Sequence, residues 1–290
     1  MRRWIVRGCD LDAGLLGSLG PADLPWALAL VLVAGAVAGA INAVVGSGTL
    51  ITFPVLLLLG MPPVMANVSN TLGLVPGAAA SVWEYRATLV ESRRLLARLV
   101  PFTVVGAIAG SLLLVVLPSD VFDAVVPVLI AAALVAILLQ PWIQRAVRAR
   151  LGAPGAAGAP GDAPAPDRVG WIPLIGVLLI GAYGGYFGAA QGILLLVTLS
   201  IALGGAFGQV NGVKNVLGGL ANLIGSIVFL IVAWQQIDWI AVLLISVGSV
   251  IGGAIGARSA KRLPPLAYRI VVLAVGAVAL VVSVVRLVES

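Results

Sequence analysis

Lys214 is the residue whose type and position most clearly suggest a chemical role, because it is the only Lys or Arg well inside a predicted apolar stretch. No Asp or Glu lies as deep in any of those stretches to pair with it. A charge in such a place is costly unless it faces a cavity or a partner, so a bound anion could supply the missing negative charge. The alternative is a lysine whose ammonium reaches the membrane interface from a shallower helix start.

Uncharged amides, hydroxyls and glycines accompany this lysine in the same apolar surroundings. Amides can coordinate an oxyanion without holding it too tightly for release. Taken singly, each is as easily a helix cap or an interhelical hydrogen bond. The candidate substrate-binding residues are Asn42, Gly46, Ser47, Gly48, Thr49, Asn67, Ser69, Asn70, Gln191, Gly192, Asn211, Lys214 and Asn215.

Two glycine-bearing breaks, 46–49 and 189–192, each precede an apolar run too short to cross a bilayer. A helix that begins inside a membrane leaves backbone N–H groups without partners, so each break must be buried in protein or line a wet cavity. These N–H groups and the helix dipole behind them favour an anion. The pattern predicts a transporter's substrate site at the paired breaks. The alternative is that the glycines only permit close helix packing.

The elements that must position these residues are transmembrane helices. The chain has 290 residues, of which 61% are hydrophobic and 10% charged, with a mean hydropathy of +1.16. A soluble domain carries roughly 25% charged residues. We therefore predict an all-α, polytopic helical protein of the plasma membrane, with the lipid bilayer as its main solvent. The net charge of +6 comes from Arg residues between apolar runs, so no nucleic acid is expected as partner.

Several classes of chemistry are excluded by composition. The chain contains 0 His and 1 Cys, Cys9, so it has no disulfide, no cysteine-based metal cage and no His-centred catalysis. A Ser–Lys pair that used Lys214 is conceivable, but no activated serine accompanies it. We expect no enzyme, no cofactor and no metal. The start of the chain lacks the pattern of a removable signal peptide.

The chain divides into two related halves. We assign 1–20 to an N-terminal tail, 21–143 to a first transmembrane repeat, 144–170 to an Ala/Gly/Pro-rich cytoplasmic linker and 171–290 to a second repeat. Three blocks of glycines and polar residues recur in the same order. The matched pairs are Gly35, Gly39 and Gly46 with Gly181, Gly185 and Gly192, then Asn70 and Gly73 with Asn215 and Gly218, then Gly106 and Gly110 with Gly252 and Gly256.

Each half contains five apolar runs, at about 26–45, 50–59, 64–83, 99–117 and 121–143 in the first half and 171–187, 193–203, 210–232, 239–257 and 267–287 in the second. Because five is an odd number, the halves are predicted to insert with opposite orientations. Arg86, Arg93 and Arg98 place the loop after the third run inside, and Arg258 does the same for the loop after the fourth run of the second half. Arg2, Arg3 and Arg7 would then lie outside, against the rule. The inverted relation is therefore a prediction that the N-terminal charges do not support.

Four features of the first half form a recognisable series, namely the break Gly46–Gly48, an L-I-x-x-P segment at Leu50–Pro54, an A-x-x-x-N stretch at Ala66–Asn70, and Tyr85-Arg86 near a helix end. With these features the first half resembles the opening repeat of the TauE/SafE sulfite exporter family. The stretches 181–196 and 210–230 resemble the second repeat of that family. This resemblance implies a transporter of sulfite, sulfonate or related sulfur anions in a bacterial plasma membrane.

Together these observations predict a membrane transporter that exports a small sulfur oxyanion or organosulfonate by alternating access. The alternatives are a transporter of another small organic anion and a non-transporting membrane assembly factor. The expected partners are a small anionic substrate and the bilayer, with a homo-oligomer as a further possibility.

Overall fold

The computed structural model describes residues 23–151, 170–202, 207–259 and 265–289, and the ordered elements within these ranges are helices. They are α1 (Leu24–Val44), α2 (Thr49–Leu58), α3 (Pro63–Glu84), α4 (Arg86–Leu89), α5 (Arg93–Val116), α6 (Ser119–Leu151), α7 (Trp171–Tyr186), α8 (Gln191–Ala202), α9 (Phe207–Val232), the 3₁₀ turn η2 (Trp234–Gln236), α10 (Trp239–Ser259) and α11 (Pro265–Glu289). The predicted N-terminal tail lies outside the described residues, as does most of the linker. Helix α6 includes the first residues that we had assigned to that linker.

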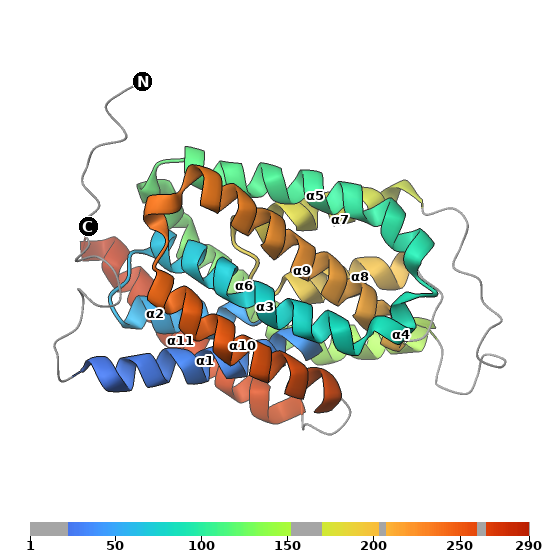
Figure 1. The fold of residues 1–290 in the computed structure, drawn as a ribbon, viewed down its shortest axis with the longest axis horizontal. Coiled ribbons are helices and arrows are strands. Elements are labelled where there is room, and N and C mark those ends of the chain that lie inside the picture. Colours follow the sequence, from blue (N-terminus) through green and yellow to red (C-terminus); the bar gives the residue numbers. More distant parts are fainter. Residues whose placement is uncertain (1–22, 152–169, 203–206, 260–264, 290) are drawn as a thin grey trace.

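The long helices lie side by side along the longest axis of the molecule (Figure 1). Each apolar run predicted from the sequence is a helix, so the prediction of a polytopic helical membrane protein is confirmed. Five described helices are long and apolar enough to cross a membrane, namely those at Leu24–Val44, Arg93–Val116, Ser119–Ile143, Gln209–Val232 and Trp239–Arg258. Large aliphatic and aromatic side chains, including Trp26, Val105 and Ile251, are exposed on the outside of the bundle, as lipid requires.

The helix contacts repeat when the two halves are exchanged. Helix α1 packs on α10 as α7 packs on α5, and α3 packs on α10 as α9 packs on α5. Similarly, α2 contacts α11 as α8 contacts α6, while α3 and α9 contact each other. The halves therefore do not form separate bodies. Each half supplies the partners that the first helix of the other half needs.

Glycines allow these helices to approach closely. A Cβ placed on Gly252 would lie 1.7 Å from the carbonyl oxygen of Ala36, and one on Gly110 would lie 1.8 Å from that of Ala182. Backbone atoms cannot move aside, so only glycine fits there. These matching contacts pair Gly110 with Gly252. The sequence match had paired Gly110 with Gly256, one helical turn later.

Helices α3 and α9, which are equivalent in the two halves, run in opposite directions. Ala78 lies beside Gly219, whereas Thr71, earlier in α3, lies beside Gly225, later in α9. An inverted repeat requires this pair of helices to be antiparallel, and the inverted relation of the two halves stays a prediction.

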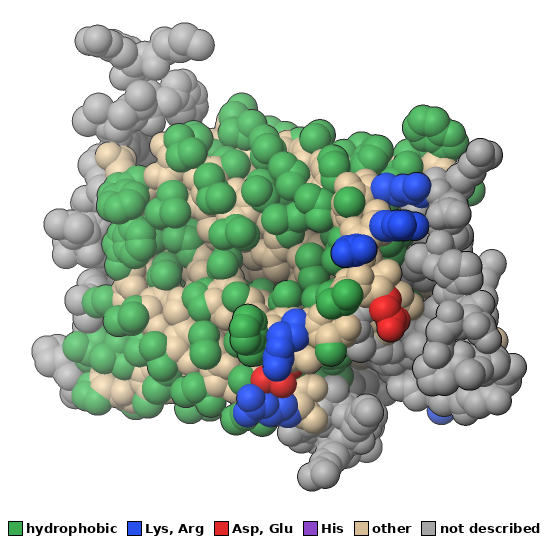
Figure 2. Space-filling view, turned by 45° about the vertical axis from the view of Figure 1, so that its right-hand side comes forward, with side chains coloured by type: hydrophobic (Ala, Val, Ile, Leu, Met, Phe, Trp, Pro, Cys, Tyr) green, Lys and Arg blue, Asp and Glu red, His purple; other side chains and the backbone are tan. Residues whose placement is uncertain are grey.

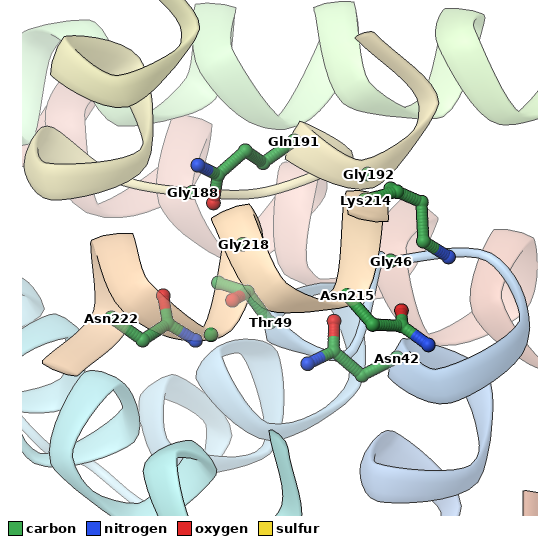
Figure 3. Close-up of a pocket in the computed structure, with 11 residues that line it drawn as sticks. Asn42, Gly46, Thr49, Gly188, Gln191, Gly192, Lys214, Asn215, Gly218 and Asn222 are labelled. Carbon is green, nitrogen blue, oxygen red and sulfur yellow. The ribbon is translucent and has the colours of Figure 1, made fainter. Parts of the chain in front are cut away.

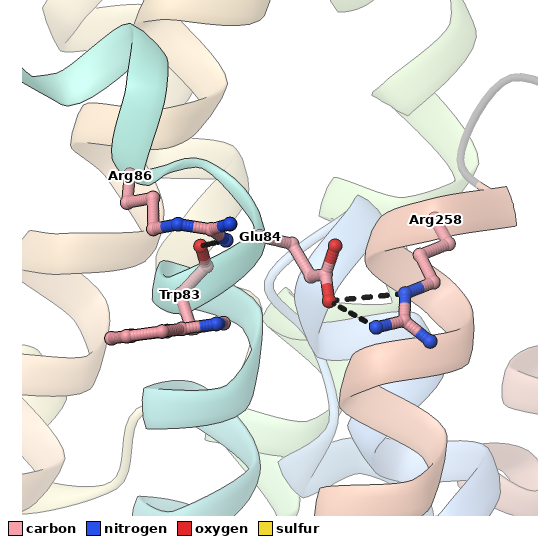
Figure 4. A network of polar contacts seen from close by, with 4 residues as sticks. All are labelled: Trp83, Glu84, Arg86 and Arg258. Atoms are coloured by element: carbon pink, nitrogen blue, oxygen red, sulfur yellow. Dashed lines mark hydrogen bonds and ion pairs between the residues drawn. The ribbon is translucent and has the colours of Figure 1, made fainter.

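Basic side chains gather at one end of the molecule (Figure 2). At this end Arg258, near the end of α10, forms an ion pair of 2.8 Å with Glu84 at the end of α3 (Figure 4). Arg86 lies 4.8 Å from the centre of the Trp83 ring and donates a hydrogen bond of 2.8 Å to the carbonyl oxygen of that residue. The ends of α3 and α10, which precede the two loops that the charge rule assigned to the inside, are therefore neighbours.

Candidate functional site

The two predicted breaks are present, and each one ends a long helix and starts a short one. The chain leaves α1 at Val44 and enters α2 at Thr49, and it leaves α7 at Tyr186 and enters α8 at Gln191. Helices α2 and α8 contain 10 and 12 residues. At about 1.5 Å per residue they cover about half of a bilayer core that is roughly 30 Å thick. Neither short helix is therefore long enough to cross the core by itself.

Glycine is needed at both breaks because the chain reverses direction there. Gly46 has φ of 82° and Gly188 has φ of 75°, in the left-handed region that side chains with a Cβ rarely occupy. Ala190 also has a positive φ, of 58°. A non-glycine residue in this conformation is uncommon and persists only when its surroundings hold it. The strained turn is thus part of the second break.

The breaks contact each other through their backbones. The N–H of Gly192 donates a hydrogen bond of 3.0 Å to the carbonyl oxygen of Gly46. A Cβ on either glycine would lie 2.4 Å from the Cα of the other. The two halves therefore meet at their breaks, and any side chain there would separate them.

The first turns of the short helices leave backbone donors free. Within the described part of the chain, the N–H groups of Ser47, Gly48 and Thr49 donate no hydrogen bond, and neither do those of Ala189 and Ala190. Such groups, at the positive end of a helix dipole, are the donors that anion sites use.

A small pocket opens beside these turns (Figure 3). Its lining comes from the end of α1, both breaks, the starts of the short helices and one face of α9. The lining residues are Asn42, Gly46, Thr49, Gly188, Gln191, Gly192, Lys214, Asn215, Gly218, Gly219 and Asn222. In Figure 3 the amides of Asn42 and Asn222 approach Thr49 from opposite sides. The pocket thus brings two helix N-termini and several amides to one space.

The structure places the predicted site residues in two groups. Those that line the pocket are Asn42, Gly46, Thr49, Gln191, Gly192, Lys214 and Asn215. Those that do not are Ser47, Gly48, Asn67, Ser69, Asn70 and Asn211.

Two amides of the second group cap helices of the opposite half. Asn67 Nδ2 donates a hydrogen bond of 2.9 Å to the carbonyl oxygen of Tyr186, the last residue of α7. Asn211 Nδ2 donates to the hydroxyl of Tyr85 at 2.8 Å and to the carbonyl oxygen of Ala43 at 3.5 Å. Burial raises the pKa of Tyr85 above its usual value, and this effect exceeds that of the bond from Asn211, which lowers it. These side chains satisfy carbonyl groups that helix ends leave unpaired.

Other members of the second group are held by hydrogen bonds around α3. Asn70 Oδ1 accepts a bond from the hydroxyl of Thr52, and its Nδ2 donates one of 3.3 Å to Thr49 Oγ1. Ser69 Oγ accepts a bond of 2.9 Å from the N–H of Asp238, just before α10. Ser47 is buried, and its hydroxyl has no partner within the described residues. The polar side chains of α3 are therefore engaged by protein groups, those of Asn70 within the first half and those of Asn67 and Ser69 across to the second half.

Lys214 is buried, with 2% of its surface exposed, so the alternative of an ammonium at the interface is wrong. Its Nζ donates a hydrogen bond of 3.3 Å to the carbonyl oxygen of Val44, the last residue of α1. Asn215 Nδ2 donates one of 3.1 Å to the neighbouring carbonyl of Ala43. Cations are favoured at the negative end of a helix dipole. No carboxylate in the described ranges forms an ion pair with Lys214.

An ammonium carries three donors, and the bond to Val44 uses one of them. In Figure 3 the ammonium of Lys214 is directed toward the break after α1, at the edge of the pocket. Its four-carbon stem is flexible, so the charge can turn toward a guest without a movement of the helix. The arrangement can thus bind an anion while α1 remains capped by the amides of α9.

Sequence reasoning missed Gly188, Gly218, Gly219 and Asn222 as lining residues. Three of them were detectable, because residues 215, 218, 219 and 222 follow the spacing of one helix face. Gly218 and Gly219 have no side chains and so leave the space of the pocket open, and Asn222 places an amide at the end of the same helix face. Gly188 could be found only from the position of the turn.

Comparisons with known proteins agree with the resemblance. The family model described as "Sulfite exporter TauE/SafE" matches residues 31–283. A "Probable membrane transporter protein" of Haemophilus influenzae is 29% identical, over 80% of this chain and 84% of that relative. "Probable membrane transporter protein ORF9" of Sinorhizobium sp is 28% identical (82% and 87%), and "Probable membrane transporter protein YfcA" of Escherichia coli K12 is 25% identical (81% and 81%). No solved structure matches.

Proposed function

The chain belongs to the sulfite exporter TauE/SafE family and is a membrane transporter, and from this premise we propose that it exports a small sulfur oxyanion or organosulfonate, such as sulfite, by alternating access. The observation that carries the proposal is the pocket between the N-termini of α2 and α8, with Lys214 buried at its edge.

The chemistry of the pocket suits a compact oxyanion. Helix N-termini offer backbone N–H groups, and the amides of Asn42, Asn215 and Asn222 add donors without adding charge. A sulfonate or sulfite group has three oxygens that can accept these bonds together. The free space in the pocket is small, so a small anion with few carbon atoms fits better than a large organic one.

The driving force proposed is the membrane potential. The sequence contains no nucleotide-binding motif, so the chain itself offers no site for ATP. An inside-negative potential favours outward movement of an anion by about 2.3 kcal/mol per charge per 100 mV. Export of a negatively charged cargo can thus proceed without a second coupled ion.

The test is flux from proteoliposomes made with purified protein and loaded with sulfite, thiosulfate, methanesulfonate, sulfate or acetate. We expect the sulfur monoanions to leave faster than acetate, and faster than from liposomes without protein. A preference for acetate would favour the alternative of a carboxylate transporter, since the same amides and helix ends can hold a carboxylate. A lack of flux for every anion would contradict the proposal and favour an assembly role.

A further inference from the structure

The pocket contains a single formal charge. Apart from Lys214, its lining residues are asparagine, glutamine, threonine and glycine, all of them uncharged. No carboxylate among the described residues pairs with this lysine. The lysine brings one positive charge to a site from which protein excludes most water.

The helix dipoles add little to this charge because each break joins two helix ends of opposite sign. The C-terminus of α1 at Val44 lies next to the N-terminus of α2 at Thr49, and that of α7 at Tyr186 lies next to that of α8 at Gln191. Each end corresponds to roughly half an elementary charge, negative at a C-terminus and positive at an N-terminus. The contributions at each break therefore oppose each other. The local donors still orient a guest, but the site as a whole balances about one negative charge.

We infer that this pocket selects anions by their charge, accepting a monovalent oxyanion and rejecting a divalent one of the same size. The inference rests on the proposed function and adds the substrate class to it. A second negative charge on the guest would be uncompensated inside the protein, and such a charge is strongly unfavourable. Sulfite would then be carried as bisulfite, whereas sulfate would be excluded.

Other ionisable groups lie near α9, and none of them belongs to the pocket lining. On the elements packed against α9 these groups are Glu84, Tyr85, Arg86, Arg93, Arg94, Arg98, Tyr183 and Tyr186. The arginines and Glu84 lie at the ends of their helices. The charge balance in the pocket therefore depends on Lys214 and on the guest.

Methanesulfonate and sulfate form a matched pair of probes, because a methyl group replaces one charged oxygen and the size is nearly the same. Each should be tested as a competitor of bisulfite flux in wild-type proteoliposomes at pH 6. We expect methanesulfonate to compete at least about tenfold better than sulfate, since a tenfold ratio requires only about 1.4 kcal/mol. Equal competition by the two anions would overturn the inference.

The charge that moves with each anion can be measured directly. With the membrane potential set by a potassium gradient and valinomycin, the potential at which methanesulfonate flux reverses reports the charge per transported anion. We expect one charge. A value of two or of zero would contradict monovalent anion transport.

A pH series separates the guest from the protein. Sulfite loses its second proton near neutral pH, whereas methanesulfonate stays monovalent. We expect sulfite flux to fall between pH 6 and pH 8 while methanesulfonate flux stays level, and a parallel fall of both would contradict the inference by assigning the titration to the protein. Absence of flux for all anions would instead refute the proposed function.

A second positive charge should relax the selection. We expect Asn222→Lys to raise competition by sulfate relative to methanesulfonate, whereas the control Asn222→Gln, which keeps an amide, should not. An unchanged ratio in a folded Asn222→Lys protein would count against the inference. If the lysine variant does not fold, the wild-type competition decides alone.

Discussion

Replacement of Lys214 by glutamine removes the charge of the pocket and leaves most of its shape. The side chain is 2% exposed, and its ammonium lies 3.3 Å from the carbonyl oxygen of Val44. The end of α1 keeps other donors, because Asn211 and Asn215 both bond to Ala43. We therefore expect Lys214→Gln to fold, and its main effect to fall on anion binding.

The size of that effect follows from the distance between the charges. Two opposite charges about 4 Å apart attract each other by about 4 kcal/mol at an effective dielectric constant of about 20. Each factor of ten in affinity corresponds to about 1.4 kcal/mol, so loss of the whole attraction would weaken binding by about three orders of magnitude. The glutamine amide returns a hydrogen bond worth about 1 kcal/mol. We therefore expect the concentration for half-maximal methanesulfonate flux to rise at least about a hundredfold.

The assay is methanesulfonate uptake into proteoliposomes over a range of concentrations. Lys214→Arg keeps the charge and should retain most of the affinity. Arg258→Gln removes one positive charge from a partly exposed ion pair with Glu84 that does not line the pocket, and should leave uptake unchanged. Size-exclusion chromatography and circular dichroism check that the proteins are folded. Half-saturation within about threefold of wild type for folded Lys214→Gln would refute the reasoning and remove this lysine from the site.

Three further substitutions test the packing, the pocket and the hydrogen bonds of the first half. Gly252→Ala places a methyl group against the backbone of Ala36 and should lower the free energy of unfolding by about 1–3 kcal/mol. In the control Gly170→Ala the added Cβ would lie 3.9 Å from its nearest atom, so the free energy of unfolding should not change. A Cβ added at Gly218 would lie 3.9 Å from its nearest atom, so Gly218→Ala should leave the melting temperature unchanged. Because Gly218 lines the pocket, we expect the added methyl group to lower anion flux. Normal flux in this variant would place the guest elsewhere. Thr52→Val removes the hydroxyl that bonds to Asn70 of α3, a bond worth about 1 kcal/mol, and should change anion flux several-fold. The control is Thr103→Val, whose hydroxyl bonds within its own helix and whose loss should leave anion flux unchanged. Equal flux in the two variants would contradict a role of the Thr52 bond in transport.

The helices were predictable because hydropathy is a local property. Each apolar run became a helix, and the short runs after the glycine breaks became α2 and α8. Gly46 was marked by its position between a long and a short run, and the positive φ there confirms that the chain needs a residue without a side chain. The pairing of helices across the halves was not predictable, because it depends on which glycine meets which backbone. That is why Gly110 was matched one turn away from its structural equivalent.

The candidate site was predictable where residue type alone decides. Lys214 was identifiable because a cation in apolar surroundings is costly unless it faces a cavity or a partner, and in the structure it lies at the edge of the pocket. Asn67, Asn211 and Asn215 looked the same in the sequence, and all three bond carbonyl groups of the opposite half, yet only Asn215 also lines the pocket. Whether such an amide also faces a guest depends on the space around it, which the sequence does not show. Asn222 was missed for the same reason, since its role depends on the space left by its neighbours.

The side chains of the two halves are unequal at the site, although the backbones repeat. Lys214 and Asn215 correspond in the repeat to Ser69 and Asn70. In the second half these residues line the pocket, whereas in the first half they are held by protein groups, among them the hydroxyl of Thr52.

Alternating access in transporters built from repeats moves one half against the other around a fixed site. A guest held by the lysine would therefore stay attached to α9 while α2 and α3, which Asn70 joins through Thr49 and Thr52, move together. The donors of α2 would then open toward the guest or turn away from it. Since the residues that the first half contributes to the pocket include no cation to compete for the anion, we expect release to depend on water reaching Lys214 and not on transfer to a second site.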